Sequence, residues 1–412
     1  MAKDVHPPRG MRDFLPLEHL KRTMVLNQIR MAYAQRGFQE IETPALEDLG
    51  RLTSGQGGDN EKLAFRVMKR GAELDGALDQ PKPEADTLAD LGLRFDLTVP
   101  LTRYYATNRA KLPNVFKAIQ AGPVWRAERP QKGRYRQFMQ CDIDIIGDGT
   151  FLAEVELLIA SLDALQGIGL AEANIRVNHR ALLMQLIAEI GVPEDGKTAA
   201  LIIIDKLDKI EAEGVTQELS EKFGAEVAKK AAKWLAEIRG ETLIPFELAE
   251  IFDAVESVHP GKLRFDPTLV RGMGYYTGPI FEIEHPGSGS SIGGGGRYDG
   301  MVGRWTGQDV AAVGISIGFE RAVELVSDDL MATRPKGIVL LLENRTPETL
   351  ANALRLQRGF LSHGEQVRLE NRVKNLKVLL DSLSAQGFNR FLAVDADSTG
   401  EVDFGALRHF GD

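Results

Sequence analysis

The sequence contains one cysteine and no long hydrophobic run. Cys141 has no second thiol with which to form a disulfide inside the chain, so a disulfide framework is excluded and a cytoplasmic location is expected. No stretch reaches the roughly 18 apolar residues of a membrane-spanning helix. The N-terminal MAKDVHPPRGMRDF lacks the apolar core of a signal peptide. We therefore expect no membrane partner.

Metal-ligand clusters and an excess of positive charge are also lacking. The histidines are scattered and form neither an HxxxH nor a Cys/His motif, so no tightly bound protein metal is expected. The net charge of −9 argues against general coating of nucleic acid. A local basic site is compatible with that total, because electrostatic steering depends on how charge is distributed.

Hydrophobic periodicity predicts an α+β fold in which an antiparallel sheet is flanked by helices. Residues 91–147 alternate with a period of two, which predicts strands with one packed face and one face open to a ligand. In LRFDLTV, Arg94, Asp96 and Thr98 would share one strand face. In residues 138–145 the alternation would direct Met139, Cys141, Ile143 and Ile145 to the packed face, and Phe138, Gln140, Asp142 and Asp144 to the open face. We therefore interpret Cys141 as a core residue and not as a nucleophile. Residues 71–90 are polar and contain two prolines, so we interpret them as a loop. The other expected elements of this region are a helix over 17–37, a strand over 38–44, a helix over 151–166, strands over 263–284 and 292–298, and a strand followed by a helix in VAAVGISIGFERAVELV.

Changes of pattern divide the chain into a core, an insertion and a C-terminal domain. Residues 1–177 and 259–330 carry the pattern of the core, whereas residues 178–258 are rich in Ala, Lys and Glu and predict an inserted helical domain. After a hinge at Arg334 and Pro335, residues 337–412 alternate between strand and helix. That order is typical of a small α/β domain.

Two glycine-rich segments differ in what they predict. GVPEDGKT (191–198) matches a phosphate-loop pattern, but a helix precedes it, Pro193 removes a backbone donor, and two acidic residues would repel phosphate. We interpret it as a turn between helices. In PGSGSSIGGGGRYDG (286–300), the first half predicts a hairpin loop entering an edge strand. The four glycines at 293–296 indicate close approach of the backbone to a ligand.

The basic segment WRAERPQKGRYRQF is the strongest candidate site. It carries five cationic side chains within residues 126–136, and a solvated basic hairpin is the simpler interpretation. Against it, Arg126 and Glu128 fall on one strand face, and Phe138 follows an expected turn at 132–133. An arginine for phosphate, a carboxylate for an exocyclic amine and an aromatic ring for a base together predict an ATP site.

Taken together, these segments resemble a class II aminoacyl-tRNA synthetase, and closely the histidyl-tRNA synthetase family. FQEIETPALE is similar to class II motif 1, WRAERPQKGRYRQFMQ to motif 2 and GISIGFER to motif 3. LVRGMGYYTGPIFE (269–282) and GGGGRYDGMVG (293–303) are similar to histidyl-specific segments. LRFDLTVPLTRYYA and QCDIDIIG resemble the family's amino-acid pocket. The resemblance runs from about residue 6 to 328 and is weaker beyond 337.

The resemblance implies that histidine and ATP form histidyl-adenylate and pyrophosphate, and that the histidyl group then passes to the 3′ end of tRNA(His). Arg126 and Arg271 would act at the α-phosphate and Arg321 at the γ-phosphate, which makes these three the implied catalytic residues. ATP would enter with Mg²⁺ as a substrate complex. The implied ATP-binding residues are Arg126, Glu128, Arg134, Arg136, Phe138 and Arg321.

The resemblance also implies a histidine pocket and a homodimer. An ammonium group needs acceptors, and an imidazole N–H can be selected by a carboxylate beside a phenol, so such a pocket would strongly reject apolar amino acids. Helix 17–37 and strand 38–44 would form the dimer interface. The implied histidine-binding residues are Asp96, Thr98, Arg126, Gln140, Asp144, Arg271, Tyr275 and Tyr276.

The chain departs from the family pattern in three places. Gly274 replaces a usual acidic residue, Met139 stands where many bacterial members have histidine, and residues 337–412 correspond to a shortened anticodon-binding domain. A non-catalytic histidine-binding relative, the regulatory subunit of ATP phosphoribosyltransferase, is therefore the alternative. Such relatives generally lose the arginines of motifs 2 and 3. Because this chain keeps them, the resemblance favours the enzyme.

Overall fold

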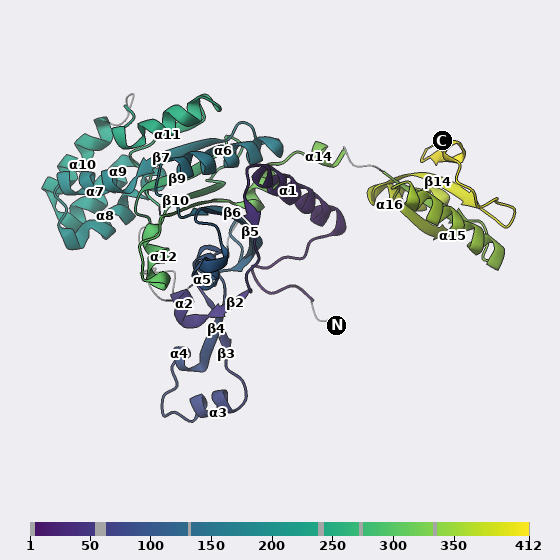
Figure 1. The fold of residues 1–412 in the computed structure, drawn as a ribbon, viewed down its shortest axis with the longest axis horizontal. Coiled ribbons are helices and arrows are strands. Elements are labelled where there is room, and N and C mark those ends of the chain that lie inside the picture. The colour runs from purple at the N-terminus through teal and green to yellow at the C-terminus, as the bar shows by residue number, and fades with distance from the viewer. Residues whose placement is uncertain are drawn as a thin grey trace. The chain divides into compact units, whose positions relative to one another are not determined.

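The chain folds into two compact units in a computed structural model that describes residues 5–53, 63–130, 133–237, 243–271, 275–332 and 336–411. The large unit comprises Met1–Asp13 and Arg22–Val326, and the second comprises Phe14–Lys21 and Ser327–Asp412 (Figure 1). Three expected features, the Lys132 turn, Gly274 and the Arg334–Pro335 hinge, lie outside the described residues.

An eight-stranded sheet forms the centre of the large unit, with the strand order β1-β5-β6-β11-β10-β9-β7-β8. Its neighbours are antiparallel except for the β1/β5 and β7/β8 pairs at the two edges, so the sheet is mixed. Parallel neighbours need a crossover, and helices α7 to α11 connect β7 to β8. The strands are β1 (Gln39–Glu40), β5 (Phe116–Trp125), β6 (Gln137–Ile146), β7 (Asn174–His179), β8 (Leu263–Phe265), β9 (Pro279–Glu284), β10 (Gly293–Arg297) and β11 (Ala312–Ile317).

Helices cover the two faces of this sheet. α6 (Leu152–Gly167) packs against β6 and β11, on the face where Cys141 and Ile143 are fully buried. The buried Cys141 confirms the interpretation of this thiol as a core residue. On the other face, α5 (Thr98–Asn108) packs against α12 (Asp299–Thr306). Further helices of this part of the chain are α1 (Pro16–Gln35), α2 (Leu49–Thr53) and α13 (Phe319–Leu325).

Residues 93–99 do not form the expected strand. β4 (Ala89–Leu93) ends where that strand was expected to begin, and Thr98 opens α5. The chain turns because Asp96 Oδ1 accepts a hydrogen bond from Val99 N at 3.1 Å, a helix-start interaction that satisfies a free backbone donor. Arg94 consequently shares no strand face with Asp96 and Thr98, and donates instead to the Thr43 and Pro123 carbonyls.

Two other expected segments also differ from the structure. Residues 71–90 contain the short helices α3 (Ala72–Leu78) and α4 (Ala85–Leu88) instead of an uninterrupted loop, and β1 covers two residues of the expected strand 38–44. Short helices of this kind carry too few residues for a hydrophobic period to show. A separate three-stranded sheet has the order β2-β4-β3, with β2 at Leu46–Asp48 and β3 at Phe65–Met68.

The helices expected in residues 178–258 gather at one end of the sheet (Figure 1). A turn joins α7 (Arg180–Glu189) to α8 (Lys197–Ile204), and no strand directly precedes that turn, so the helix–turn–helix interpretation of GVPEDGKT is confirmed. Leu183 and Leu235 of this region share one hydrophobic cluster with Ile280 of β9. The remaining helices are α9 (Leu207–Phe223), α10 (Ala225–Glu237) and α11 (Phe246–Glu256). The domain limits at 178 and 258 stay a prediction.

The second unit has the strand–helix alternation that the sequence predicts. Its sheet order is β13-β12-β14-β15, in which the first three strands are parallel and β15 is antiparallel. Thr346 starts α15 by accepting from Thr349 N. Its elements are α14 (Asp329–Ala332), β12 (Gly337–Leu342), α15 (Pro347–Ser362), β13 (Val367–Asn371), α16 (Leu376–Ala385), β14 (Phe388–Val394) and β15 (Arg408–His409).

β10 is central in the sheet, between β9 and β11, and its glycines are therefore not on an edge strand as expected. A Cβ at Gly295 would lie 1.9 Å from the Gly314 carbonyl oxygen of β11.

We expect Gly295→Ala to lower the free energy of unfolding by more than ~2 kcal/mol, because the strands would have to separate. Urea unfolding measures this. The control Gly76→Ala, where a Cβ meets nothing within 4 Å, should instead be neutral or stabilising; equal effects of the two changes would contradict the packing argument.

Candidate active site

Two buried carboxylates on β6 define the centre of the site. Asp142 and Asp144 are 5% and 3% exposed and lie on the sheet face opposite Cys141. Asp144 Oδ1 accepts a hydrogen bond of 2.6 Å from the hydroxyl of Tyr298, which is 2% exposed. Gly314 makes room for this contact, because a Cβ there would lie 1.9 Å from Asp144 Oδ1.

The surroundings change the ionisation of these acids. Burial raises the pKa of the Asp144 carboxyl to about 7, the Tyr298 hydrogen bond lowers it, and the charge of Asp96 raises it. Burial and then the charge of Asp144 raise the pKa of Asp142. Asp142 Oδ1 and Gln140 Oε1 are buried and accept no hydrogen bond within the described part of the chain. Buried oxygens without donors are the kind that a cationic or N–H ligand satisfies.

A tyrosine pair lies beside these acids. The rings of Tyr275 and Tyr276 are 4.3 Å apart between centroids, at an interplanar angle of 56°. A Cβ at Gly296 would come within 3.0 Å of Tyr276 Cδ1, so this glycine is what lets the ring lie against β10. Burial, followed by Tyr275, raises the pKa of Tyr276, and Arg271 and Asp144 are among the charges acting on it.

Arg271 and Arg321 meet at the start of β10. Arg271 Nη1 donates to Glu282 Oε2 at 2.6 Å and to the Gly293 carbonyl oxygen at 3.3 Å. Arg321 Nη1 donates to the carbonyl oxygen of Ser291. Burial lowers the pKa of Arg321, as do the positive charges of Arg134 and Arg271. Cations held this close together favour a polyanionic ligand.

Arg126 reaches the same region from the hairpin between β5 and β6. Its Nε donates to the Phe95 carbonyl oxygen at 3.0 Å, and its guanidinium carbon lies 5.1 Å from the centre of the Phe138 ring. Burial raises the pKa of Tyr275, and the charges of Asp96, Arg271 and Arg126 also act on this group. Arg126 and Arg271, 145 positions apart in the sequence (271 − 126), therefore act on the same tyrosine.

The other hairpin residues have different surroundings. Arg134 is exposed and lies 3.8 Å from a carboxylate oxygen of Glu128. Arg136 Nε donates to the backbone carbonyl of Glu128 at 2.9 Å, so part of this side chain is engaged in holding the hairpin. Thr98 and Asp96 are half-buried at the start of α5. Asp96 acts electrostatically on Asp144, so it joins the site although it lies on a helix start and not on a strand.

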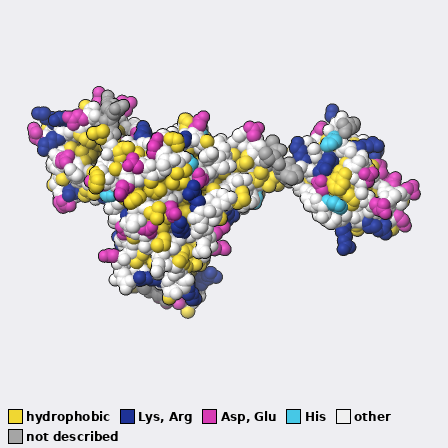
Figure 2. Space-filling view, turned by 45° about the horizontal axis from the view of Figure 1, so that its top comes forward, with side chains coloured by type: hydrophobic (Ala, Val, Ile, Leu, Met, Phe, Trp, Pro, Cys, Tyr) yellow, Lys and Arg dark blue, Asp and Glu magenta, His cyan; other side chains and the backbone are white. Residues whose placement is uncertain are grey.

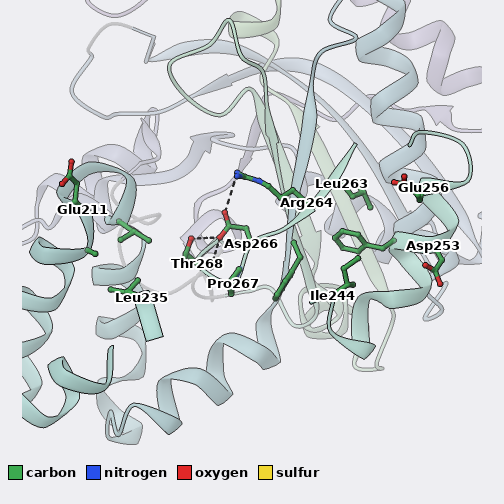
Figure 3. Close-up of a pocket in the computed structure, with 14 residues that line it drawn as sticks. Glu211, Leu235, Ile244, Asp253, Glu256, Leu263, Arg264, Asp266, Pro267 and Thr268 are labelled. Carbon is green, nitrogen blue, oxygen red and sulfur yellow. Dashed lines mark hydrogen bonds and ion pairs between the residues drawn. The ribbon is translucent and has the colours of Figure 1, made fainter. Parts of the chain in front are cut away.

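A separate pocket of about 840 Å³ lies between α9, α10, α11 and β8. Figure 3 shows acidic and apolar side chains around it, with Arg264 directed toward Asp266. None of the expected site residues lines it. Acidic and basic side chains are interspersed over the face of the molecule in Figure 2.

The described ranges contain neither a metal-ligand cluster nor a membrane-spanning helix. There, no three His, Cys, Asp or Glu side chains form a group that could hold a metal ion. Over the same residues, no helix combines the length and apolarity needed to cross a membrane.

Sequence reasoning missed three residues of the site. Tyr298 holds Asp144, and Glu282 holds Arg271. Asp142, between Gln140 and Asp144 in the sequence, presents an oxygen that has no hydrogen-bond partner among the described residues. The strand alternation already placed Asp142 on the ligand face. Tyr298 and Glu282 fall within the quoted GGGGRYDG and LVRGMGYYTGPIFE segments, but their partners are too distant in the chain for a pattern to identify.

A mixed sheet that brings a hairpin arginine, a helix-start arginine and a glycine strand to one face defines a class II aminoacyl-tRNA synthetase. The family model for histidyl-tRNA synthetase matches residues 10–322. The chain is 49% identical to a histidine–tRNA ligase of Leifsonia xyli subsp. xyli (strain CTCB07), with 97% of each chain covered. It is 42% identical to a probable histidine–tRNA ligase of Tropheryma whipplei (strain Twist), over 94% of this chain and 95% of the relative. The chain therefore belongs to the histidyl-tRNA synthetase family.

Solved structures agree with this assignment. The crystal structure of histidyl-tRNA synthetase from Nostoc sp. PCC 7120 superposes with a TM-score of 0.75 and 25% identity, covering 95% of this chain and 92% of that one. An ATP phosphoribosyltransferase regulatory subunit/histidyl-tRNA synthetase from Bacillus halodurans C also gives a TM-score of 0.75, at 22% identity, with 95% and 98% coverage. At this identity, the similarity to the Bacillus halodurans protein shows only that the two chains share a fold. The expected family and α+β fold are confirmed.

The buried charge of Asp144 makes stability depend on pH. The pKa of Asp144 is about 7 in the folded protein, which exceeds the ordinary value of about 4 in an unfolded chain. The stability that this carboxyl contributes is therefore fully present below pH ~4 and is lost as the pH rises through about 7. Asp144→Asn keeps an oxygen acceptor for Tyr298 and removes the charge. Relative to the unchanged protein, we expect the free energy of unfolding of Asp144→Asn to increase by roughly 2–3 kcal/mol as the pH rises from 5 to 8.

Urea unfolding at the two pH values measures this difference. Asp253→Asn, at an exposed position on α11, is the matched control and should shift little between pH 5 and pH 8. A pH dependence that Asp144→Asn leaves unchanged would show that this carboxyl is not the group responsible.

Proposed function

We propose that this histidine–tRNA ligase forms histidyl-adenylate on the face of the sheet that carries Asp144 and β10. The observation that carries the proposal is the arrangement around β10: Arg271 lies over Gly294 and Tyr276 against Gly296. Gly296 pairs with Gly314 of β11, which in turn pairs with Asp144 of β6. A cationic site for phosphate thereby borders a buried acid–phenol pair. Adenylate formation needs both, because a histidine carboxylate must be held against the α-phosphorus of ATP.

ATP, as its Mg²⁺ complex, would bind along the arginines. Arg126 and Arg271 would hold the α-phosphate and Arg321 the γ-phosphate, while Glu128 would accept from the adenine amine and Phe138 would stack on the ring. A histidine carboxylate oxygen then attacks the α-phosphorus and pyrophosphate leaves. Arg271 is already fixed by Glu282 at 2.6 Å, so its charge is in place as negative charge develops in the transition state. Arg134 and Arg136 would line the phosphate side from the hairpin.

Histidine would bind deeper, against β6. Asp144 would accept from the imidazole N–H, with Tyr276 and Tyr275 beside the ring. Asp96, Thr98 and Gln140 would surround the ammonium group, which supplies donors for the buried Gln140 Oε1. An apolar amino acid would leave these buried groups without partners, and such a loss costs several kcal/mol of binding.

The aminoacyl acceptor would be tRNA(His), charged in the cytoplasm. The second unit supports a role in tRNA binding, because the similarity to the Leifsonia ligase covers 97% of this chain and so includes this unit. We propose that it acts as the anticodon-binding domain. The alternative of a non-catalytic histidine-binding regulator is disfavoured because Arg126, Arg271 and Arg321 are all present.

Pyrophosphate exchange tests the proposed chemistry. The purified chain with ATP, Mg²⁺ and histidine should exchange labelled pyrophosphate into ATP. Arg271→Ala should lower that rate by about 10²–10³-fold, because one preorganised charge at the reacting phosphate is lost, while histidine still binds in calorimetry. Arg390→Ala breaks an ion pair with Glu365 in the second unit and should leave exchange unchanged. Absence of exchange in the intact chain would favour the regulator.

We also propose a homodimer that uses helix 17–37 and strand 38–44. β1 is an exposed edge strand, and such edges offer unpaired backbone groups to a second chain. Met31 on α1 is 49% exposed. Sedimentation at micromolar concentration should give a dimer, and Met31→Glu should shift it toward the monomer. Leu78→Glu, at a residue 51% exposed on α3, is the control. A monomeric parent protein would overturn this assignment.

A further inference from the structure

Arg176 is a buried arginine that no sequence motif singled out. It lies on β7 with its side chain 8% exposed. Its Nε and Nη2 atoms lie 2.7 and 2.6 Å from Asp266 Oδ2. Its Nη1 atom lies 3.0 Å from Glu282 Oε1, 3.2 Å from Glu284 Oε1 and 3.3 Å from Asp208 Oδ2. A guanidinium with this many partners is held in one orientation.

Glu282 joins Arg176 to Arg271. One carboxylate oxygen, Oε1, accepts from Arg176, and the other, Oε2, accepts from Arg271 Nη1 at 2.6 Å. The Glu282 side chain is 17% exposed. Because each of its oxygens has a cationic donor, the carboxylate can rotate only if it loses one of them.

The strand register aligns this group across the sheet. Arg176 on β7 is the direct partner of Glu282 on β9, which is the direct partner of Gly294 on β10. A Cβ at Gly294 would lie 2.6 Å from Arg271 Cζ, so the guanidinium occupies the space that a side chain would fill. Three adjacent strands thus form a slot for Arg271, with Glu282 as one wall and Arg176 behind it.

Arg176 balances the negative charges of the carboxylates around the Arg271 slot. Without its guanidinium, Glu282, Glu284 and Asp266 would keep their negative charges close together, with Arg264 and Arg271 as neighbouring cations. Glu282 would be free to turn, and Arg271 would be drawn toward the excess negative charge and away from a phosphate. At short range in a partly buried site this competition is strong.

The other anchors of Arg176 lie outside the reaction site. Asp266 lines the separate pocket in Figure 3, and Asp208 lies in the first turn of α9 in the helical region. Neither residue forms a hydrogen bond or ion pair with Arg271 within the described contacts. Arg176 is therefore held in part by groups that are not among the expected site residues.

We propose that Arg176 is a positioning residue for adenylate formation: it holds Glu282 in the orientation that keeps Arg271 in its slot over Gly294. This inference rests on the proposed role of Arg271. It assigns to Arg176 an effect on the rate of the chemical step and not on histidine recognition, because, apart from Arg271 itself, no side chain of the implied histidine pocket bonds to Arg176 or Glu282 within the described contacts.

The test is pyrophosphate exchange with Arg176→Met, alone and combined with Arg271→Ala. We expect Arg176→Met to lower kcat on the order of tenfold, since small misplacements of a reacting group can cost this much, with KM for histidine unchanged. In the Arg271→Ala background the same change should have no further effect, because the two residues act through one interaction. Arg176→Lys keeps the positive charge but loses the planar guanidinium group with its several donors. Its kcat should therefore lie between those of the unchanged protein and Arg176→Met.

Arg390→Met is the matched control, because it removes a half-buried arginine from its ion pair with Glu365 in the second unit and should leave kcat for exchange unchanged. Thermal unfolding of every variant separates a folding defect from a kinetic one, and Arg176→Lys carries the test if Arg176→Met does not fold. An equal loss of kcat in both backgrounds, or a raised KM for histidine at unchanged kcat, would overturn the inference. If Arg271→Ala itself exchanges normally, the proposed function fails instead, and the two failures are distinguishable.

Discussion

The central constraint on this protein is that β10 must be nearly without side chains. Its glycines let β9 and β11 lie against it, and they leave space above the strand that other residues occupy. Arg271 lies over Gly294 and Tyr276 against Gly296. Any larger residue would push the arginine and the tyrosine away from the sheet, or separate the strands. The close approach expected from the glycine run is therefore made first by the protein's own side chains.

A second constraint is the cost of burying charge. Asp142 and Asp144 are placed two residues apart on a strand where both are shielded from water, and both carboxyl pKa values rise as a result. Groups of this kind reduce stability near neutral pH and are characteristic of functional sites. The neighbouring arginines show the opposite arrangement, because each is held by carbonyl or carboxylate oxygens before any substrate arrives. The site is thus preorganised for charge of both signs.

Particular elements show where sequence patterns succeed. The alternation in residues 138–145 assigned Asp142 and Asp144 to the ligand face and Cys141 to the core, because strand periodicity depends only on neighbouring residues. The strand–helix order of the C-terminal unit was predicted for the same reason. The alternation in LRFDLTV was misleading, since the Asp96 carboxylate starts a helix there. Within the expected strand 38–44 the structure has a strand of two residues, and residues 71–90 contain helices that are too short to show a hydrophobic period.

By itself, the sequence determined most of the element types, the packed face of β6 and, through its motifs, which residues are candidates for the site. These are local properties, set by the spacing of apolar and polar side chains. Only the tertiary structure decided the partners: Tyr298 with Asp144, Glu282 between Arg176 and Arg271, and the central place of β10. Such contacts join residues up to 154 positions apart, and they depend on strand order and register, which no local spacing encodes.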